Sequence, residues 1–113
     1  MEKVHEIIWR LGIPATYLGQ RYLIAAIQLA VKKESSLVCI KNVYEEVAAM
    51  YGVTTDSVIK AIRTVIRICW NQGHRAFLQE MAGFPLLKPP TPATFISIIV
   101  TYLLRNHAYR KWM

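Results

Sequence analysis

The segment of residues 44–63 constrains the fold of this 113-residue sequence more than any other part. Ala48 and Gly52 are four residues apart at the end of one apolar helical pattern, and a second pattern starts two or three residues later. Ala48 is small, so a second helix can cross close to it, and Gly52 can adopt the positive φ that a sharp turn requires. Val53 supplies an apolar side chain to fill that turn. The pattern predicts a helix-turn-helix at about residues 41–71.

The second helix of this pair, at about residues 55–71, has two different faces. Thr54 or Thr55 can cap its start with a hydroxyl, and Asp56 suits the positive end of the helix dipole. The inward face is apolar and consists of Val58, Ala61, Ile62, Val65 and Cys69. The outward face lies within about 60° of arc. It consists of one acidic and three basic residues, Asp56, Lys60, Arg63 and Arg67.

The rest of the chain also shows helical spacing of its apolar residues, with short breaks between the segments. The first helix is expected to end at Gly12 and Pro14, and the short apolar run Leu37–Ile40 is interpreted as a buried connector. The remaining expected helices are one from a Thr16 cap to about Lys33, a short one over His74–Met81, and a last one from Thr91 or Thr94 towards the C-terminus. The sequence therefore predicts one compact all-α domain of six helices spanning residues 1–113.

The net charge is +7, and it is concentrated in the second half of the chain. Residues 54–113 contain eight basic and two acidic residues. A basic surface of this kind favours nucleic acid, an anionic membrane or an acidic protein as partner. No signal peptide or apolar segment of about twenty residues is present, so we expect a cytoplasmic protein without a membrane partner.

The sequence lacks the patterns expected of an enzyme or a metal site. His5, His74 and His107 are scattered, and no HExxH motif, zinc-ligand spacing or glycine-rich phosphate loop occurs. Cys39 and Cys69 form no disulfide framework, so we expect free buried thiols in a reducing compartment. We therefore expect no catalytic activity, no cofactor and no metal.

Residues spread from about Val4 to Leu104 carry a family resemblance. The matching residues are Gly12–Ala15, Tyr22–Leu23, Ala26–Ile27, Thr54–Thr55, Val58, Ala61–Arg63, Trp70, Gly73, Gly83, Pro90–Thr91 and Phe95–Ile96. In these positions the chain resembles the C-terminal effector domain of the sporulation response regulator, stage zero sporulation protein A. The resemblance implies a six-helix domain that binds a short promoter box of double-stranded DNA in the major groove.

The resemblance and the helix-turn-helix pattern together name three groups of site residues. The candidate DNA-binding residues are Thr54, Thr55, Asp56, Ile59, Lys60, Arg63, Thr64 and Arg67, and the family positions that match Lys60 and Arg63 are DNA-contacting arginines. The resemblance implies that residues 73–86 face the sigma subunit of RNA polymerase, with Gly73, Gln79, Met81 and Leu86 as candidates. It also implies that neighbouring copies meet through the last helix, where the candidate dimer residues are Phe95, Ile99, Tyr102 and Leu103.

The chain departs from the family pattern in the second helix of the pair. Ile59 stands where the family normally has an acidic residue, Lys60 replaces an arginine, and Ser57 stands where arginine is frequent. A carboxylate accepts from cytosine N4, whereas isoleucine can only touch a thymine methyl group or pack against the core. Lysine lacks the two-pronged donor geometry with which arginine binds guanine. We therefore expect DNA binding, but not the family's own promoter box.

Two questions stay open at the level of sequence. The family places this domain behind a phosphoacceptor receiver, and a chain that starts at Met1 is either an excised fragment or a stand-alone protein. The last helix is apolar on nearly every side, which fits burial in its own domain or pairing with a second subunit. The alternative to a DNA-binding regulator is a protein-interaction module of the same fold that uses Ile59 and the last helix.

Overall fold

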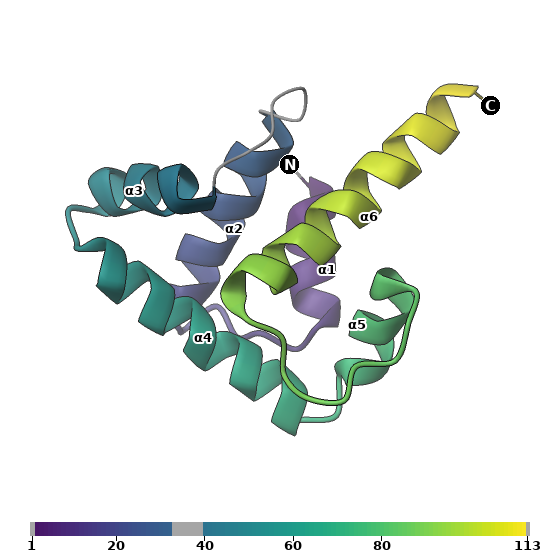
Figure 1. Cartoon of the computed structure of the whole chain (residues 1–113), viewed down its shortest axis with the longest axis horizontal. Helices are drawn as coiled ribbons and strands as arrows, with labels where there is room; N and C mark the ends of the chain where they lie inside the picture. The colour runs from purple at the N-terminus through teal and green to yellow at the C-terminus, as the bar shows by residue number, and fades with distance from the viewer. Residues whose placement is uncertain (1, 33–39, 113) are drawn as a thin grey trace.

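The computed structural model describes residues 2–32 and 40–112, and within them the chain is entirely helical apart from turns and loops (Figure 1). The prediction of an all-α, six-helix fold is confirmed for these residues. The helices are α1 (Glu2–Arg10), α2 (Leu18–Lys32), α3 (Ile40–Tyr51), α4 (Thr55–Asn71), α5 (Arg75–Ala82) and α6 (Pro92–Trp112).

The second helix, α2, is the centre of the packing. It contacts α1, α3, α4 and α6. Every residue from Tyr22 to Ile27 is buried, so α2 has no continuous solvent face over these two turns. A helix that is apolar all round must be covered all round, and the four neighbouring helices supply that cover.

The crossing of α2 and α4 depends on Gly19, which is buried in the first turn of α2. A Cβ atom built on Gly19 would overlap the backbone carbonyl of Ala61 and would also press on the Val65 side chain. The two helices therefore approach each other more closely here than any larger residue at position 19 allows. This contact holds the middle of α4 against the central helix.

The turn between α3 and α4 is a tight one of residues 52–54. The Gly52 N–H donates to the Ala49 carbonyl at 3.4 Å, and the Val53 N–H donates to the Ala48 carbonyl at 3.0 Å. This pair of hydrogen bonds is a Schellman motif, and it requires the positive φ of 64° that Gly52 adopts. Ala48 is buried and Val53 packs against the core, as the helix-turn-helix pattern predicts.

Aromatic ring contacts join α1, α5 and α6, and a side-chain cap fixes the start of α6. The Arg10 guanidinium lies 3.7 Å from the ring centre of Phe77, and Phe77 meets Tyr102 edge to face at 6.4 Å, which connects α1, α5 and α6. Thr91 precedes α6, and its hydroxyl accepts from the Thr94 N–H at 3.3 Å. Of the two predicted starts, Thr91 is therefore the capping residue, and Pro92 occupies the first helical position.

The start of α2 and the segment before α3 differ from the sequence predictions or lie outside the described residues. The prediction of Thr16 as a cap is wrong by one residue, because Tyr17 and Pro14 form a turn and α2 begins at Leu18, so that Tyr17 directly precedes the helix. The predicted connector Leu37–Ile40 lies outside the described residues except for Ile40, which begins α3 and is half-buried. Cys39 is outside them as well, whereas Cys69 is free and buried as expected.

Replacing Gly19 tests the α2–α4 crossing. We expect Gly19→Ala to lower the free energy of unfolding by about 1–3 kcal/mol, because the added methyl group forces the two helix backbones apart. Urea unfolding followed by circular dichroism measures this change. Arg21→Ala is the matched control on an exposed position of the same helix, and its midpoint should stay close to that of the wild type. Equal midpoints for the two variants would show that the crossing is not tight.

Candidate nucleic-acid interface

The inner face of α4 anchors the helix in the core. Val58, Ile62, Val65 and Cys69 are fully buried, and Ile66 and Trp70 are nearly so. Burial of this face fixes the rotation of α4 about its own axis, because any turn of the helix would expose these side chains to water. The opposite face is therefore held outwards in one orientation. Burial also raises the pKa of Cys69 to about 11, so its thiol is neutral and inert at physiological pH.

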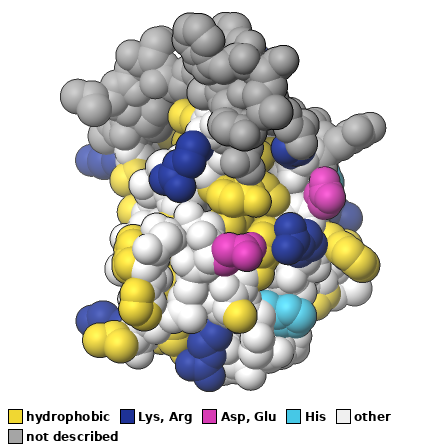
Figure 2. Space-filling model, turned by 90° about the vertical axis from the view of Figure 1, so that its right-hand side faces the viewer, with side chains coloured by type: hydrophobic (Ala, Val, Ile, Leu, Met, Phe, Trp, Pro, Cys, Tyr) yellow, Lys and Arg dark blue, Asp and Glu magenta, His cyan; other side chains and the backbone are white. Residues whose placement is uncertain are grey.

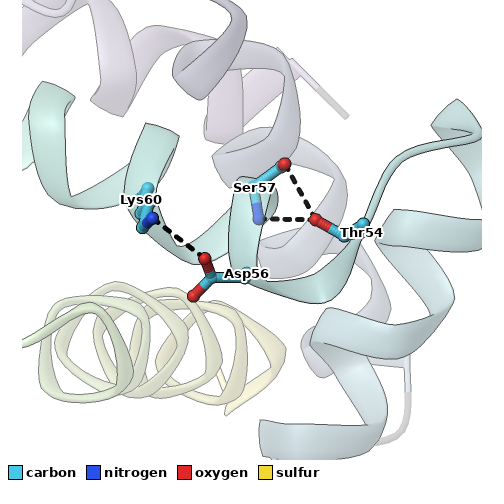
Figure 3. A network of polar contacts seen from close by, with 4 residues as sticks. All are labelled: Thr54, Asp56, Ser57 and Lys60. Atoms are coloured by element: carbon cyan, nitrogen blue, oxygen red, sulfur yellow. Dashed lines mark hydrogen bonds and ion pairs between the residues drawn. The ribbon is translucent and has the colours of Figure 1, made fainter.

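The start of α4 is fixed by Thr54, which takes the N-cap position with extended backbone angles. Its Oγ1 accepts from the Ser57 N–H at 3.1 Å and donates to the Ser57 hydroxyl at 2.8 Å (Figure 3). This satisfies one of the backbone N–H groups that a helix start leaves without a partner. Of the two predicted caps, Thr54 or Thr55, the structure has Thr54, and its hydroxyl is engaged within the protein.

The outward face of α4 is charged and open to solvent. Asp56, Lys60, Arg63 and Arg67 are all exposed. Lys60 Nζ lies 3.0 Å from Asp56 Oδ2, and the two side chains are 71% and 72% exposed (Figure 3). An ion pair this exposed contributes little to stability, so an incoming anion can separate it at small cost. Arg63 and Arg67 have no ion-pair partner among the residues that the structure describes.

Arg63 lies close enough to the tyrosine of the preceding helix to act on it electrostatically. Burial of Tyr44 raises the pKa of its phenol, and the nearby Arg63 guanidinium opposes part of that rise. Tyr44 is almost fully buried on α3, whereas Arg63 is exposed on α4. The guanidinium therefore sits at the junction of α3 and α4, on the outer side of the helix-turn-helix.

The other candidate residues of α4 differ in what they expose. Thr64 is exposed, but its hydroxyl donates to the Lys60 carbonyl at 3.0 Å within the same helix. Thr55 and Ile59 are half-buried, and Ile59 packs against the core. Ile59 therefore lies at the edge of the core, with part of its side chain buried and part open to solvent.

The structure brings a lysine to this site that the sequence patterns do not connect with it. The chain between α5 and α6 passes along the second half of α4 (Figure 1). It forms with α4 a cavity of about 280 Å³ that is lined by Arg63, Ile66, Arg67, Lys88, Pro89, Pro90, Thr91 and Pro92. Lys88 is more than twenty positions from Arg63 and Arg67 in the chain, so only tertiary packing joins the three cations.

The arrangement of a capped, outward-facing basic helix agrees with the comparison to known families. Residues 4–103 match the family described as sporulation initiation factor Spo0A C terminal. The chain belongs to this family. The family is one of DNA-binding effector domains that regulate transcription in sporulation, and it is not a family of enzymes. The resemblance read from the sequence is thereby confirmed over nearly the whole chain.

The segment that the Spo0A C-terminal family resemblance assigns to the polymerase is only partly on the surface. Gly73 is exposed, but Met81 is 2% exposed and forms part of the core, so its side chain has little surface to offer a partner. The expectation that this segment contacts polymerase stays a prediction. Gln79 and Leu86 are half-buried, and Gln79 Oε1 accepts from the Leu86 N–H at 2.7 Å. This hydrogen bond ties the chain after α5 back onto α5.

The residues predicted as dimer contacts on α6 are mostly interior. Phe95 and Ile99 are fully buried and Leu103 is 7% exposed, while Tyr102 is half-buried against Phe77. Phe95, Ile99 and Leu103 therefore offer little side-chain surface to a second copy, because α2, α4 and α5 pack against α6. Pairing of copies through α6 stays a prediction. Among residues 92–105 of α6, the exposed stripe consists of Ala93, Thr94, Ser97, Thr101 and Arg105.

The side of the molecule that carries α5 and α6 differs from the outer face of α4. Its Lys and Arg side chains are spread among hydrophobic and uncharged ones and do not gather into one patch (Figure 2). Among the described residues, no helix is long and apolar enough to cross a membrane, and no three His, Cys, Asp or Glu side chains are grouped to hold a metal ion.

The cap of α4 can be tested with two threonines of the same region. We expect Thr54→Ala to lower the free energy of unfolding by about 1 kcal/mol, because the Ser57 N–H loses its acceptor. Thr64→Ala removes a hydroxyl that bonds only to its own helix, so its free energy of unfolding should stay within about 0.5 kcal/mol of the wild type. Thermal or urea unfolding of the three proteins measures both effects, and equal losses would contradict the capping role.

Proposed function

We propose that this protein is a sequence-specific transcription regulator that reads the major groove of double-stranded DNA with α4. The observation that carries the proposal is the outward row of Lys60, Arg63 and Arg67 on a helix whose opposite face is buried and whose start is capped. A helix fits the major groove of B-DNA, and its first turns approach base edges. A cytoplasmic location is part of this proposal, because the target is DNA.

The three cations have different parts in this proposal. Arg63 lies in the third turn of α4, and its planar guanidinium can donate two hydrogen bonds to guanine O6 and N7. Lys60 is a point charge that must first leave Asp56, so its contribution to base recognition is smaller. Arg67, one turn further from the helix start, is suited to a phosphate. Thr55 and Asp56, near the helix start, and the capping residue Thr54 complete the contact surface.

Ile59 is proposed to alter which bases are preferred. Ile59 is half-buried and lies about 40° from Arg63 around the helix. An apolar side chain in the groove favours a thymine methyl group over cytosine. The resemblance places an acidic residue at this position in the family. We therefore expect a target that differs from the family's box at one base pair or two.

Two protein partners belong to the proposal on the strength of the resemblance. The sigma subunit of RNA polymerase would meet the exposed part of residues 73–86, where Phe84 is 54% exposed and Gly73 is open. Neighbouring copies on DNA would meet through the exposed stripe of α6 together with the half-buried Tyr102, since Phe95, Ile99 and Leu103 are buried. The alternative of a protein-interaction module that uses an apolar last helix is weakened for the same reason.

Selection from a random pool of DNA duplexes at near-physiological salt tests the proposed function. A recovered consensus sequence is expected, and its half-site spacing would give the arrangement of neighbouring copies. Binding that is steeply salt-dependent but blind to sequence would contradict base reading by α4. No binding at all would contradict the proposal as a whole.

Arg63 gives the sharpest test of the recognition helix. We expect Arg63→Ala to weaken binding to the selected duplex by about 1–3 kcal/mol and to relax the preference at one base pair. Arg63→Lys keeps the charge but lacks the two-pronged donor, so it should retain non-specific affinity and lose discrimination. Fluorescence anisotropy with matched and mismatched duplexes measures both quantities. Unchanged discrimination in both variants would assign base reading to another element.

Ile59→Glu tests the difference in target sequence. We expect the preferred base at one position to change from thymine towards cytosine, because the carboxylate can accept from cytosine N4. Repeating the selection with this variant measures the change, and the unfolding midpoint checks that the half-buried position tolerates glutamate. An unchanged consensus from a folded variant would show that Ile59 only packs against the core.

A further inference from the structure

The charged residues that line the cavity between α4 and the chain leading into α6 are all positive. Arg63, Arg67 and Lys88 line it, and its remaining lining residues are apolar or uncharged. Among the residues that the structure describes, none of the three has an ion-pair partner. Three cations around one cavity without a carboxylate repel each other, so an anion in the cavity would be favourable.

The loop that carries Lys88 is stiff and is attached at both ends. The Leu86 N–H donates to Gln79 Oε1 at 2.7 Å on the α5 side, and Thr91 caps α6 on the other side. Lys88 precedes Pro89, which restricts its backbone to extended conformations, and Pro90 and Pro92 follow. The lysine is therefore presented beside α4 by a backbone with few alternative conformations, which lowers the entropy lost when it binds a ligand.

The cavity is large enough for a phosphate group. Its volume of about 280 Å³ is several times the roughly 30 Å³ that one water molecule occupies in the liquid. It is open to solvent and adjoins the exposed row of cations on α4. If α4 lies in the major groove, the flanking loop lies beside the sugar–phosphate backbone that borders the groove.

We infer that Lys88 and Arg67 bind a backbone phosphate of DNA in this cavity, beside the base-reading end of α4. The inference rests on the proposed function and extends it to a second element, the loop before α6. Lys88 then acts as a positioning contact, which sets the register of α4 on the duplex without reading sequence. Arg63, at the border between the cavity and the outer face, stays available for a base edge.

The first test compares two lysine variants of equal charge. Lys88→Gln should weaken binding to every duplex by about two- to five-fold, as expected for an exposed ion pair. It should also reduce the slope of log affinity against log salt by about one. Lys32→Gln is the control, because Lys32 ends α2, about 20 Å along that helix from the Gly19 contact with α4. Its affinity and slope should equal those of the wild type.

The second test identifies the phosphate. Duplexes are prepared in which one backbone phosphate at a time is replaced by an uncharged methylphosphonate. One replacement beside the binding site should weaken the wild type and Lys32→Gln equally, and it should weaken Lys88→Gln clearly less, because only the Arg67 contact is left to lose. This loss of additivity is expected when two groups form one contact.

The outcomes separate the inference from the proposed function. If the wild type binds a specific duplex and Lys88→Gln keeps its affinity, salt slope and full methylphosphonate sensitivity, the inference is overturned and base reading by α4 stands. If the wild type binds no DNA, both are overturned. Lys88 is exposed, so Lys88→Gln should fold, and its unfolding midpoint provides the check.

Discussion

The close crossing of α2 and α4 at Gly19 is the contact on which the outer surface of the molecule depends. No side chain separates the two helices at this point, and the Ala61 carbonyl faces the space where a Cβ atom would be. Since α2 is surrounded by α1, α3, α4 and α6, a helix that touches it so closely can neither slide nor roll freely. The direction of the cations on α4 therefore follows from a packing constraint on its inner side.

The electrostatics of the outer side follow from the same orientation. Asp56 lies in the first turn of α4, where the helix dipole stabilises a negatively charged carboxylate. It forms a solvent-exposed ion pair with Lys60. The excess positive charge is thus carried by Arg63 and Arg67, which have no such partner among the described residues. These unpaired cations lie away from the helix start, next to the loop that brings Lys88 to the same cavity.

The sequence predicted most where local chemistry decides the structure. The bounds of α4, its cap at Thr54, the turn at Gly52 and the exposed positions of the charged face all follow from residues within one or two helical turns of each other. The sequence could not distinguish core residues from partner contacts at Phe95, Ile99, Leu103 and Met81, because an apolar residue on a helix needs cover and periodicity cannot tell whether the same chain or a partner provides it. Here the same chain provides it.

The sequence by itself therefore determined the class of fold, the family, the helix-turn-helix and the side of α4 that carries positive charge. Tertiary structure alone decided which helix is central, which apolar faces are closed, and that Lys88 joins Arg63 and Arg67 around one cavity. The physical reason is the separation in sequence of the residues that interact. Capping, turn conformation and helical periodicity depend on neighbours in sequence, whereas burial and the meeting of distant charges depend on how the complete set of helices fills space.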